Sequence, residues 1–356
     1  MLAVSILCRA VAIALSSAFL AAFALTPSHA QSSNDLAVTP SAADWAAARH
    51  ATHLSRHARP AHLDAAPRIA GTLPSHPASA AAPAAAPAGP PLVRYPGDLS
   101  YHGGAVVDFT ESHAIYLNPN GSCTIASCWG NPEGFLRDLG QSGFIHLVDQ
   151  YIGLSANNRY TVGRRTRINF QPNPPSGPFA SAPFTDDDML AVVHAVASAS
   201  DETGYQHIYH VFLPPGTDEC LDSTFTVCYS PDNRSSYYFC AYHGSVDFTD
   251  IGHVLYSVEP YQNVRGCQVR PGTPNGQLAD STNNVLSHEL FEILTDPDGK
   301  GWWNSMDNGL YQQEIGDECS FIIPHYFDPS TITLDDHQYA AQLEYDNSQH
   351  ACTAGR

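Results

Sequence analysis

Residues 281–297, STNNVLSHELFEILTDP, carry the strongest structural signal in this chain of 356 residues. The stretch begins with helix-capping residue types and stops at a proline, which predicts a helix over residues 279–295. This helix is apolar around most of its circumference, and such a helix is buried. Two ionisable residues, His288 and Glu292, nevertheless lie four positions apart on one of its faces. Burying them alone costs on the order of several kcal/mol each, so we expect a compensating partner such as a divalent metal ion.

The motif inside the helix is His288-Glu289-Leu290-Phe291-Glu292. It resembles H-E-x-x-H, in which two histidines bind zinc and the glutamate between them is the general base of a metallopeptidase. Here a glutamate replaces the second histidine, and a carboxylate is also a zinc ligand. The pattern therefore predicts His288 and Glu292 as metal ligands and Glu289 as the catalytic base that activates water. The alternative is a buried His–Glu hydrogen bond, or a structural metal, that only fixes the helix.

A third ligand is expected downstream, because zinc sites need at least three protein ligands. Glu314 lies 22 residues after Glu292, as in zinc peptidases whose third ligand is a glutamate on a second helix, and Asp317 is its close rival. Asp298 occupies the position that another peptidase group uses. Calcium is the alternative metal, because one histidine and two carboxylates also suit it and the following loop is rich in oxygen ligands. These loop residues match no EF-hand pattern and are Asp296, Asp298, Asn304 and Asp307.

The expected donor geometry separates these hypotheses. If a zinc ion is bound, the donor atoms of His288, Glu292 and either Glu314 or Asp317 should lie roughly 3–4 Å apart around one point. Glu289 should face that point without being a ligand, at the bottom of an open cleft.

The remaining pattern predicts an α+β fold with a single domain, a mixed β-sheet and flanking helices. Helical periodicity covers residues 131–152, and Thr185 is a good N-cap for a helix that runs to about Ser200. We expect loops in the cysteine-rich region after residue 213. Strand-like segments cover residues 105–117, 159–170, 207–213, 254–258 and 331–345.

The N-terminus is typical of a secretion signal. Arg9 precedes an apolar stretch over residues 10–25, and Ser28-His29-Ala30 places small residues where signal peptidase cleaves. Sixteen residues are short of the roughly 20 that cross a bilayer. We therefore expect residues 1–30 to be a cleaved signal peptide and the protein to be secreted.

Residues 31–92 are rich in alanine, proline, serine and histidine and poor in large apolar side chains. This composition predicts a disordered Ala/Pro-rich linker, with residues 93–356 as the globular domain. We expect truncation near Leu92 to leave stability unchanged. Four histidines fall in the segment and are expected to belong to a polar linker rather than to a metal site: His50, His53, His57 and His62.

Charge limits the classes of partner. Residues 93–356 contain 11 basic and 32 acidic residues, within a chain of net charge −19. Such an acidic domain has no electrostatic footprint for nucleic acid or an anionic membrane. We therefore expect an extracellular protein or cell-wall carbohydrate as the partner.

Cysteine usage agrees with export, since an even number of cysteines in an exported chain predicts disulfide bonds. Eight cysteines follow the signal segment. We expect Cys123 to pair with Cys128, because they are close in sequence, and Cys319 to pair with Cys352, the last two. The remaining four cannot be paired from sequence: Cys220, Cys228, Cys240 and Cys267.

Over residues 95–356 the chain resembles the exordium (phosphate-induced) family. The resemblance rests on motifs in the family's order, at residues 101–104 (YHGG), 240–243 (CAYH), 287–297 (SHELFEILTDP), 301–303 (GWW), 314–319 (EIGDEC) and 342–345 (QLEY). Members of this family are secreted proteins of plants and some bacteria, without an established biochemical activity. The resemblance implies export and one folded domain.

Two functional hypotheses follow. The first is a secreted zinc hydrolase, most plausibly peptidase-like, that uses the residues named above. The second is a non-catalytic extracellular module in which the same residues hold a structural metal or a hydrogen-bond network.

Overall fold

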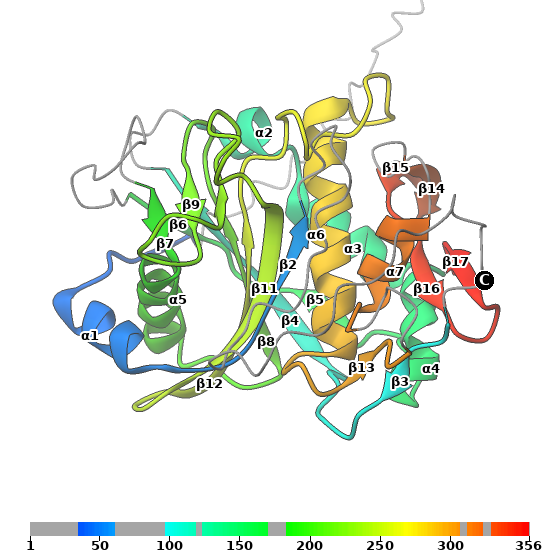
Figure 1. The fold of residues 1–356 in the computed structure, drawn as a ribbon, viewed down its shortest axis with the longest axis horizontal. Helices are drawn as coiled ribbons and strands as arrows, with labels where there is room; N and C mark the ends of the chain where they lie inside the picture. The colour runs from blue at the N-terminus through cyan, green and yellow to red at the C-terminus, as the bar shows by residue number, and fades with distance from the viewer. Residues whose placement is uncertain are drawn as a thin grey trace, which may run out of the picture. The chain divides into compact units, whose positions relative to one another are not determined.

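An eight-stranded mixed sheet is the centre of the computed structural model, which describes residues 35–60, 97–118, 123–169, 183–306, 312–322 and 329–355 (Figure 1). Seven strands follow the order β1-β6-β4-β8-β12-β11-β2, and β5 pairs with β4. Strands β1, β6, β4, β8 and β12 run parallel to one another, whereas β11 is antiparallel to both β12 and β2. The strands of this sheet are β1 (Leu36–Ala37), β2 (Thr52–Pro60), β4 (Thr110–Leu117), β5 (Tyr160–Val162), β6 (Thr166–Ile168), β8 (His207–Phe212), β11 (Phe239–Phe248) and β12 (Gly252–Glu259).

Helices cover both faces of the sheet. Successive residues of a strand point to opposite faces, so Ala114 and Tyr116 join one hydrophobic core while Ile115 and Leu117 join the other. Helices α1 and α5 lie on one side, and α3 and α6 lie on the other (Figure 1). The helices are α1 (Ala42–His50), α2 (Ile125–Cys128), α3 (Pro132–Gln141), the 3-10 helix η1 (Ile145–Val148), α4 (Asp149–Ile152), α5 (Asp186–Ser200), α6 (Gln277–Thr295) and α7 (Ile315–Ile322).

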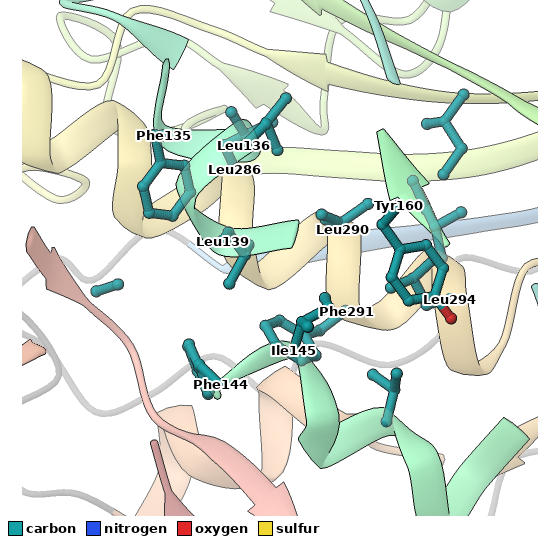
Figure 2. Packing of buried hydrophobic residues seen from close by; sticks show 14 of the residues in the cluster. Phe135, Leu136, Leu139, Phe144, Ile145, Tyr160, Leu286, Leu290, Phe291 and Leu294 are labelled. Atoms are coloured by element: carbon teal, nitrogen blue, oxygen red, sulfur yellow. The ribbon is translucent and has the colours of Figure 1, made fainter. Parts of the chain in front are cut away.

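The α6 side of the sheet holds an aromatic and leucine-rich core (Figure 2). Leu286, Leu290 and Phe291 of α6 belong to the same core cluster as Phe135 of α3, and the rings of Phe291 and Phe144 lie 4.8 Å apart. Each such side chain contributes about 1.5–3 kcal/mol when it is fully buried. This packing fixes α6 against the sheet, so that its polar positions are held in place.

Small sheets and disulfide bonds complete the fold. The predicted pairs Cys123–Cys128 and Cys319–Cys352 are confirmed, and the other four cysteines pair as Cys220–Cys228 and Cys240–Cys267. The remaining strands form one three-stranded sheet and three two-stranded sheets. They are β7 (Phe184–Thr185), β9 (Glu219–Cys220) and β10 (Cys228–Tyr229), then β3 (Ser100–Tyr101) with β13 (Trp302–Trp303), β14 (Ser330–Leu334) with β15 (His337–Ala341), and β16 (Glu344–Asp346) with β17 (Ala351–Thr353).

The prediction of a disordered linker over residues 31–92 is wrong for residues 35–60. These residues form β1, α1 and β2, and β2 pairs with β11 from Pro60 opposite Phe239 to Thr52 opposite Asp247. The residues of β2 that face α6 are polar, so the segment lacks the apolar alternation that marks a half-buried strand. The compact unit therefore begins at residue 35 rather than at residue 93. The predicted signal peptide and linker residues 31–34 and 61–92 lie outside the described residues, as do residues 93–96 of the predicted domain.

Two predicted helices agree well with the structure. Helix α6 begins two residues before the predicted helix and ends where expected, and Thr185 caps α5 through a capping box with Asp188. The mixed sheet with flanking helices is confirmed, whereas β11 lies where loops were expected. Among the described residues, none of the helices combines the length and apolar character that a membrane crossing requires.

Candidate functional site

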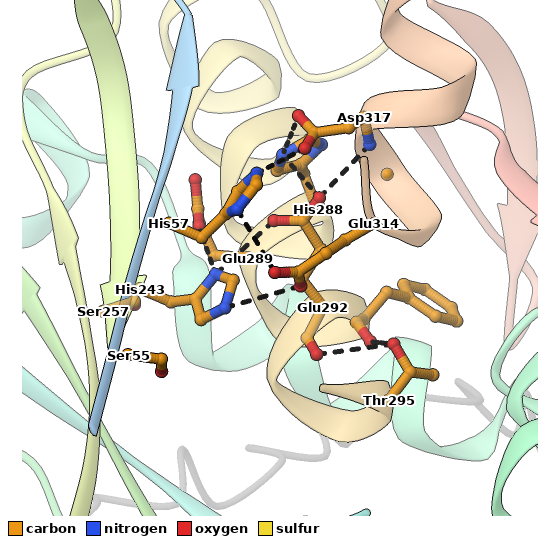
Figure 3. A network of polar contacts seen from close by, with 12 residues as sticks. Ser55, His57, His243, Ser257, His288, Glu289, Glu292, Thr295, Glu314 and Asp317 are labelled. Atoms are coloured by element: carbon orange, nitrogen blue, oxygen red, sulfur yellow. Dashed lines mark hydrogen bonds and ion pairs between the residues drawn. The ribbon is translucent and has the colours of Figure 1, made fainter. Parts of the chain in front are cut away.

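The sheet contributes two histidines to a buried polar cluster under α6 (Figure 3). The antiparallel register of β2 and β11 places His57 directly opposite His243. Their rings stack with centroids 5.8 Å apart. Because both side chains point to the α6 face of the sheet, the strand pairing alone delivers two imidazoles to one place.

Helix α6 supplies the facing residues. His243 Nδ1 lies 3.1 Å from Glu289 Oε2 and 3.4 Å from Glu292 Oε2. One turn away, His288 Nε2 lies 3.2 Å from Glu292 Oε1. All three α6 residues are fully buried, with no exposed surface.

Helix α7 completes the cluster from the other side. Asp317 Oδ2 contacts His57 Nε2, Asp317 Oδ1 lies 3.8 Å from His288 Nε2, and the Asp317 backbone N–H donates to Glu292 Oε1 at 3.2 Å. This approach depends on Gly316, because a Cβ atom there would lie 2.4 Å from His288 Nδ1. The glycine thus lets α7 bring a carboxylate onto the face of α6.

Glu314 lies between the two sheet histidines. Its Oε1 is 3.2 Å from His57 Nδ1, and its Oε2 is 3.6 Å from His243 Nε2. Each histidine therefore presents one ring nitrogen to Glu314 and the other to the carboxylates nearer α6 and α7. In metal sites the ring nitrogen that does not bind the metal commonly faces a carboxylate in this way.

A glutamine orients the His288 ring. Gln342 Nε2 donates to Gly316 O at 2.6 Å, and Gln342 Oε1 accepts from Ser320 Oγ at 3.2 Å. These bonds fix the amide so that its NH₂ group faces His288 Nδ1 at 3.2 Å, which makes Nδ1 the acceptor. In a neutral ring Nε2 then carries the proton and faces Glu292.

The cluster is rich in polar atoms without hydrogen-bond partners. Within the described parts of the chain, seven such atoms belong to this cluster, and a buried atom of this kind costs about 1–3 kcal/mol. A cation that coordinates several of them would remove that cost. The atoms are His57 Nδ1, His243 Nε2, His288 Nε2, Glu289 Oε1, Glu292 Oε2, Glu314 Oε2 and Asp317 Oδ1.

Without a metal, protons compensate for part of the buried charge. Burial alone would lower the pKa of His57, but the charge and the hydrogen bond of Asp317, together with the charge of Glu292, raise that pKa to about 9. Hydrogen bonds to Glu289 and Glu292 similarly overcome burial and raise the pKa of His243 to about 10. Burial, reinforced by neighbouring carboxylates, raises the pKa of Glu314 well above its ordinary value. In the metal-free cluster, His57 and His243 are thus protonated at neutral pH.

Two sets of donors converge closely enough to hold a metal ion. Three atoms from His57, Glu292 and Asp317 lie within 4.8 Å of one another, and three from His243, Glu289 and Glu292 do the same. We name these sets the β2 triad and the β11 triad. Glu292 belongs to both. Histidine nitrogen with carboxylate oxygen is a ligand set that suits zinc and other first-row divalent ions.

The structure brings the five residues of the zinc prediction, His288, Glu289, Glu292, Glu314 and Asp317, into this one cluster. Distances of 3.2 Å from His288 Nε2 to Glu292 Oε1 and 3.8 Å to Asp317 Oδ1 fall in the expected range. Two features differ from the expectation. Glu289 is within ligand distance rather than set apart, and no cluster side chain is more than 5% exposed, where an open cleft was expected.

Sequence reasoning missed His57 and His243. His57 was assigned to a disordered linker, and His243 lies in the cysteine-rich region where loops were expected. The alternation of Ser55, His57 and Arg59 was the available signal for β2, but it is polar on the buried face. Only the strand register shows that the two histidines are neighbours.

The alternative ligand residues lie elsewhere. Asp298 accepts a hydrogen bond from Tyr205 at 2.5 Å, and Asn304 bonds to Glu318. Asp307 lies outside the described residues. Two of the predicted calcium ligands, Asp298 and Asn304, are therefore engaged by protein side chains.

A further donor set lies near the N-terminal ends of β4 and β8. Glu111, His113 and His207 place donor atoms within 4.8 Å of one another, and His113 Nε2 is 3.0 Å from His207 Nδ1. The Glu111 side chain is 36% exposed. This set is a separate, partly exposed surface feature, because its residues contact none of the cluster under α6.

Comparisons with known proteins add no assignment. No protein-family model matches the chain, and no curated protein and no solved structure shows a significant match.

Proposed function

We propose that this chain is a metal-binding protein whose buried cluster holds a divalent ion, with zinc the metal that the ligand types favour. The observation that carries this proposal is the presence of three carboxylate oxygens without hydrogen-bond partners, Glu289 Oε1, Glu292 Oε2 and Asp317 Oδ1, in a cluster of at most 5% exposure. A bound cation accounts for these atoms, whereas a network of hydrogen bonds leaves them without partners.

The nitrogen ligands in this proposal are His57 and His243. Their inner nitrogens face the carboxylates of the two triads while their outer nitrogens face Glu314. His288 is assigned a positioning role, because the Gln342 amide leaves the proton on the nitrogen that faces Glu292. Asp317, Glu289 and Glu292 supply the oxygen ligands.

Complete burial favours a structural role for the ion. A catalytic zinc keeps an open coordination position that water and substrate can reach, and a closed site stabilises the fold instead. Residues from β2, β11, α6 and α7 meet in the cluster, so one ion would connect four elements that are far apart in sequence. Metal binding would then contribute directly to the free energy of folding.

A metal-dependent, peptidase-like hydrolase is the second candidate. Glu289 supports it, because this residue occupies the position of the general base in the helix motif, and burial raises its pKa. Replacing Glu289 by Gln should abolish hydrolysis of a casein or peptide-library substrate while most of the bound metal is retained. Full activity in the Glu289→Gln protein would exclude the peptidase mechanism.

The metal proposal is tested by elemental analysis of protein purified without chelators. We expect at least one equivalent of zinc or a related ion in the unmodified chain and a loss of metal in Asp317→Asn. His350→Gln is the matched control, since this exposed histidine lies outside the cluster and its replacement should leave the metal content unchanged. A folded, metal-free chain that cannot bind zinc, manganese or cobalt would refute the proposal.

We further propose an extracellular location and a protein or wall-carbohydrate partner. Four disulfide bonds and the secretion-type N-terminus support this location. The resemblance to the exordium family is consistent with it. Secretion of a tagged chain into culture medium, with loss of residues 1–30 detected by mass spectrometry, is the test.

A further inference from the structure

The two triads share one residue but form two separate sets. The β2 triad contributes its own histidine and aspartate, and the β11 triad contributes its own histidine and glutamate. Two ligand atoms on one ion are at most about 4.4 Å apart, which is twice a bond of about 2.2 Å. The donor atoms of each triad lie within 4.8 Å of one another, close to this limit, so each triad is near the size of one coordination site.

The carboxylate of Glu292 is turned toward both triads. Its Oε2 lies 3.4 Å from His243 Nδ1, on the β11 side. Its Oε1 lies 3.2 Å from the backbone nitrogen of Asp317, on the β2 side. One oxygen for each site is the arrangement of a bridging carboxylate, which is common where two ions lie about 3.5–4 Å apart.

Glu314 supports both histidines from behind. A histidine that binds a metal through one nitrogen donates its other N–H, often to a carboxylate. His57 and His243 use different nitrogens toward the triads, and both remaining nitrogens face Glu314, at 3.2 Å and 3.6 Å. A single carboxylate thus fixes the ring orientation of two separate nitrogen ligands.

Charge also favours a pair of ions. Four carboxylates, those of Glu289, Glu292, Glu314 and Asp317, are buried in the cluster. With both histidines neutral, as ligands must be, two divalent cations balance four negative charges. One divalent cation would leave two negative charges buried, and uncompensated buried charge is costly.

We propose that the cluster is a dinuclear centre for two first-row divalent ions, one in each triad, with Glu292 as the bridging ligand and Glu314 as the positioning carboxylate. This inference rests on the proposed metal-binding function and specifies its stoichiometry and ligand roles. Because the donors are imidazole nitrogens and carboxylate oxygens, zinc, manganese, iron and cobalt belong to the class of ions that it would take.

The test uses the full chain, stripped with a chelator, dialysed and reloaded with Mn²⁺ alone. His207→Gln is used as the reference protein, so that the surface set of Glu111, His113 and His207 does not contribute to the count. Equilibrium dialysis should give two Mn²⁺ per chain. Electron paramagnetic resonance should show a magnetically coupled pair, whose hyperfine spacing is half that of an isolated ion.

The variants assign the two ions to their triads. His57→Gln and His243→Gln in the reference protein should each retain one ion and lose the coupled spectrum. If a variant fails to fold, the electron paramagnetic resonance spectrum and the number of Mn²⁺ ions bound by the reference protein still show whether the centre is dinuclear. Two uncoupled ions, or one ion, would overturn the dinuclear proposal while the metal-binding function stands. No bound ion in a folded chain would overturn both.

Discussion

The free energy of unfolding of the metal-stripped chain should fall as pH rises from 7.5 to 9. His57 and His243 have pKa values raised to about 9 and about 10, so in this range they are protonated in the folded chain. In the unfolded chain a histidine has a pKa of about 6.5 and is neutral. The folded state therefore binds more protons, and stability decreases with increasing pH.

The expected slope follows from the number of protons involved. One proton of difference changes the free energy of unfolding by about 1.4 kcal/mol per pH unit, and two protons by about 2.7. Glu318, whose pKa burial raises to about 8, acts in the same direction. Stability should be measured by urea unfolding at intervals of half a pH unit, with the chelator present throughout.

Two variants, His57→Gln and His350→Gln, and the addition of zinc make this measurement decisive. His57→Gln should reduce the slope of unfolding free energy against pH by the contribution of about one proton, roughly 1.4 kcal/mol per pH unit. His350→Gln, an exposed control, should leave this slope unchanged. Added zinc should reverse the trend, because metal binding displaces these protons and strengthens as pH rises. A stripped chain whose stability stays constant or increases between pH 7.5 and 9 would refute the assignment of protonated histidines in the cluster.

Three further outcomes are expected. Removal of residues 1–34 should leave the melting temperature nearly unchanged. Removal of residues 1–60 should abolish cooperative unfolding or metal binding, because β2 and His57 are lost. Calorimetry of both truncated chains tests this expectation. Replacing Cys319 and Cys352 together by serine should cost roughly 3–4 kcal/mol in urea unfolding on the loop-entropy argument, and no loss would contradict it. Phe291→Ala should lower the free energy of unfolding by about 3–5 kcal/mol, because the Phe291 side chain of α6 is fully buried. A loss below 1 kcal/mol would show that the core collapses around the cavity.

The sequence was informative where a local pattern and the final environment agree. Helix α6 combines capping residues, a terminal proline and a buried apolar surface, and α5 combines a threonine cap with three aspartates in its first turn. The Cys319–Cys352 bond was predicted from cysteine order. The motif on α6 also led to four acidic residues and one histidine that the structure brings together.

Sequence reasoning failed where a strand faces a polar site. The buried face of β2 carries Ser55, His57 and Arg59, so its composition is that of an exposed or disordered segment. Likewise, His243 lies in a strand that was expected to be a loop. Placing these two histidines beside α6 requires the strand order and register, which are non-local and cannot be derived from the spacing of residues along the chain.

The position of β2 at the edge of the sheet has a consequence for biogenesis. Ser55 on β2 contacts Ser245 on β11 across 190 positions of sequence. At a synthesis rate of about 5–20 residues per second, β2 waits roughly 10–40 s for its partner strand to be made. During that time its edge is unpaired and one histidine of the cluster has no neighbours. The last contributor, Asp317 on α7, is made later still, so the growing chain cannot be stabilised by the centre. The availability of chaperones that bind the nascent chain, rather than the supply of metal, would therefore limit how much of the chain escapes degradation before it folds.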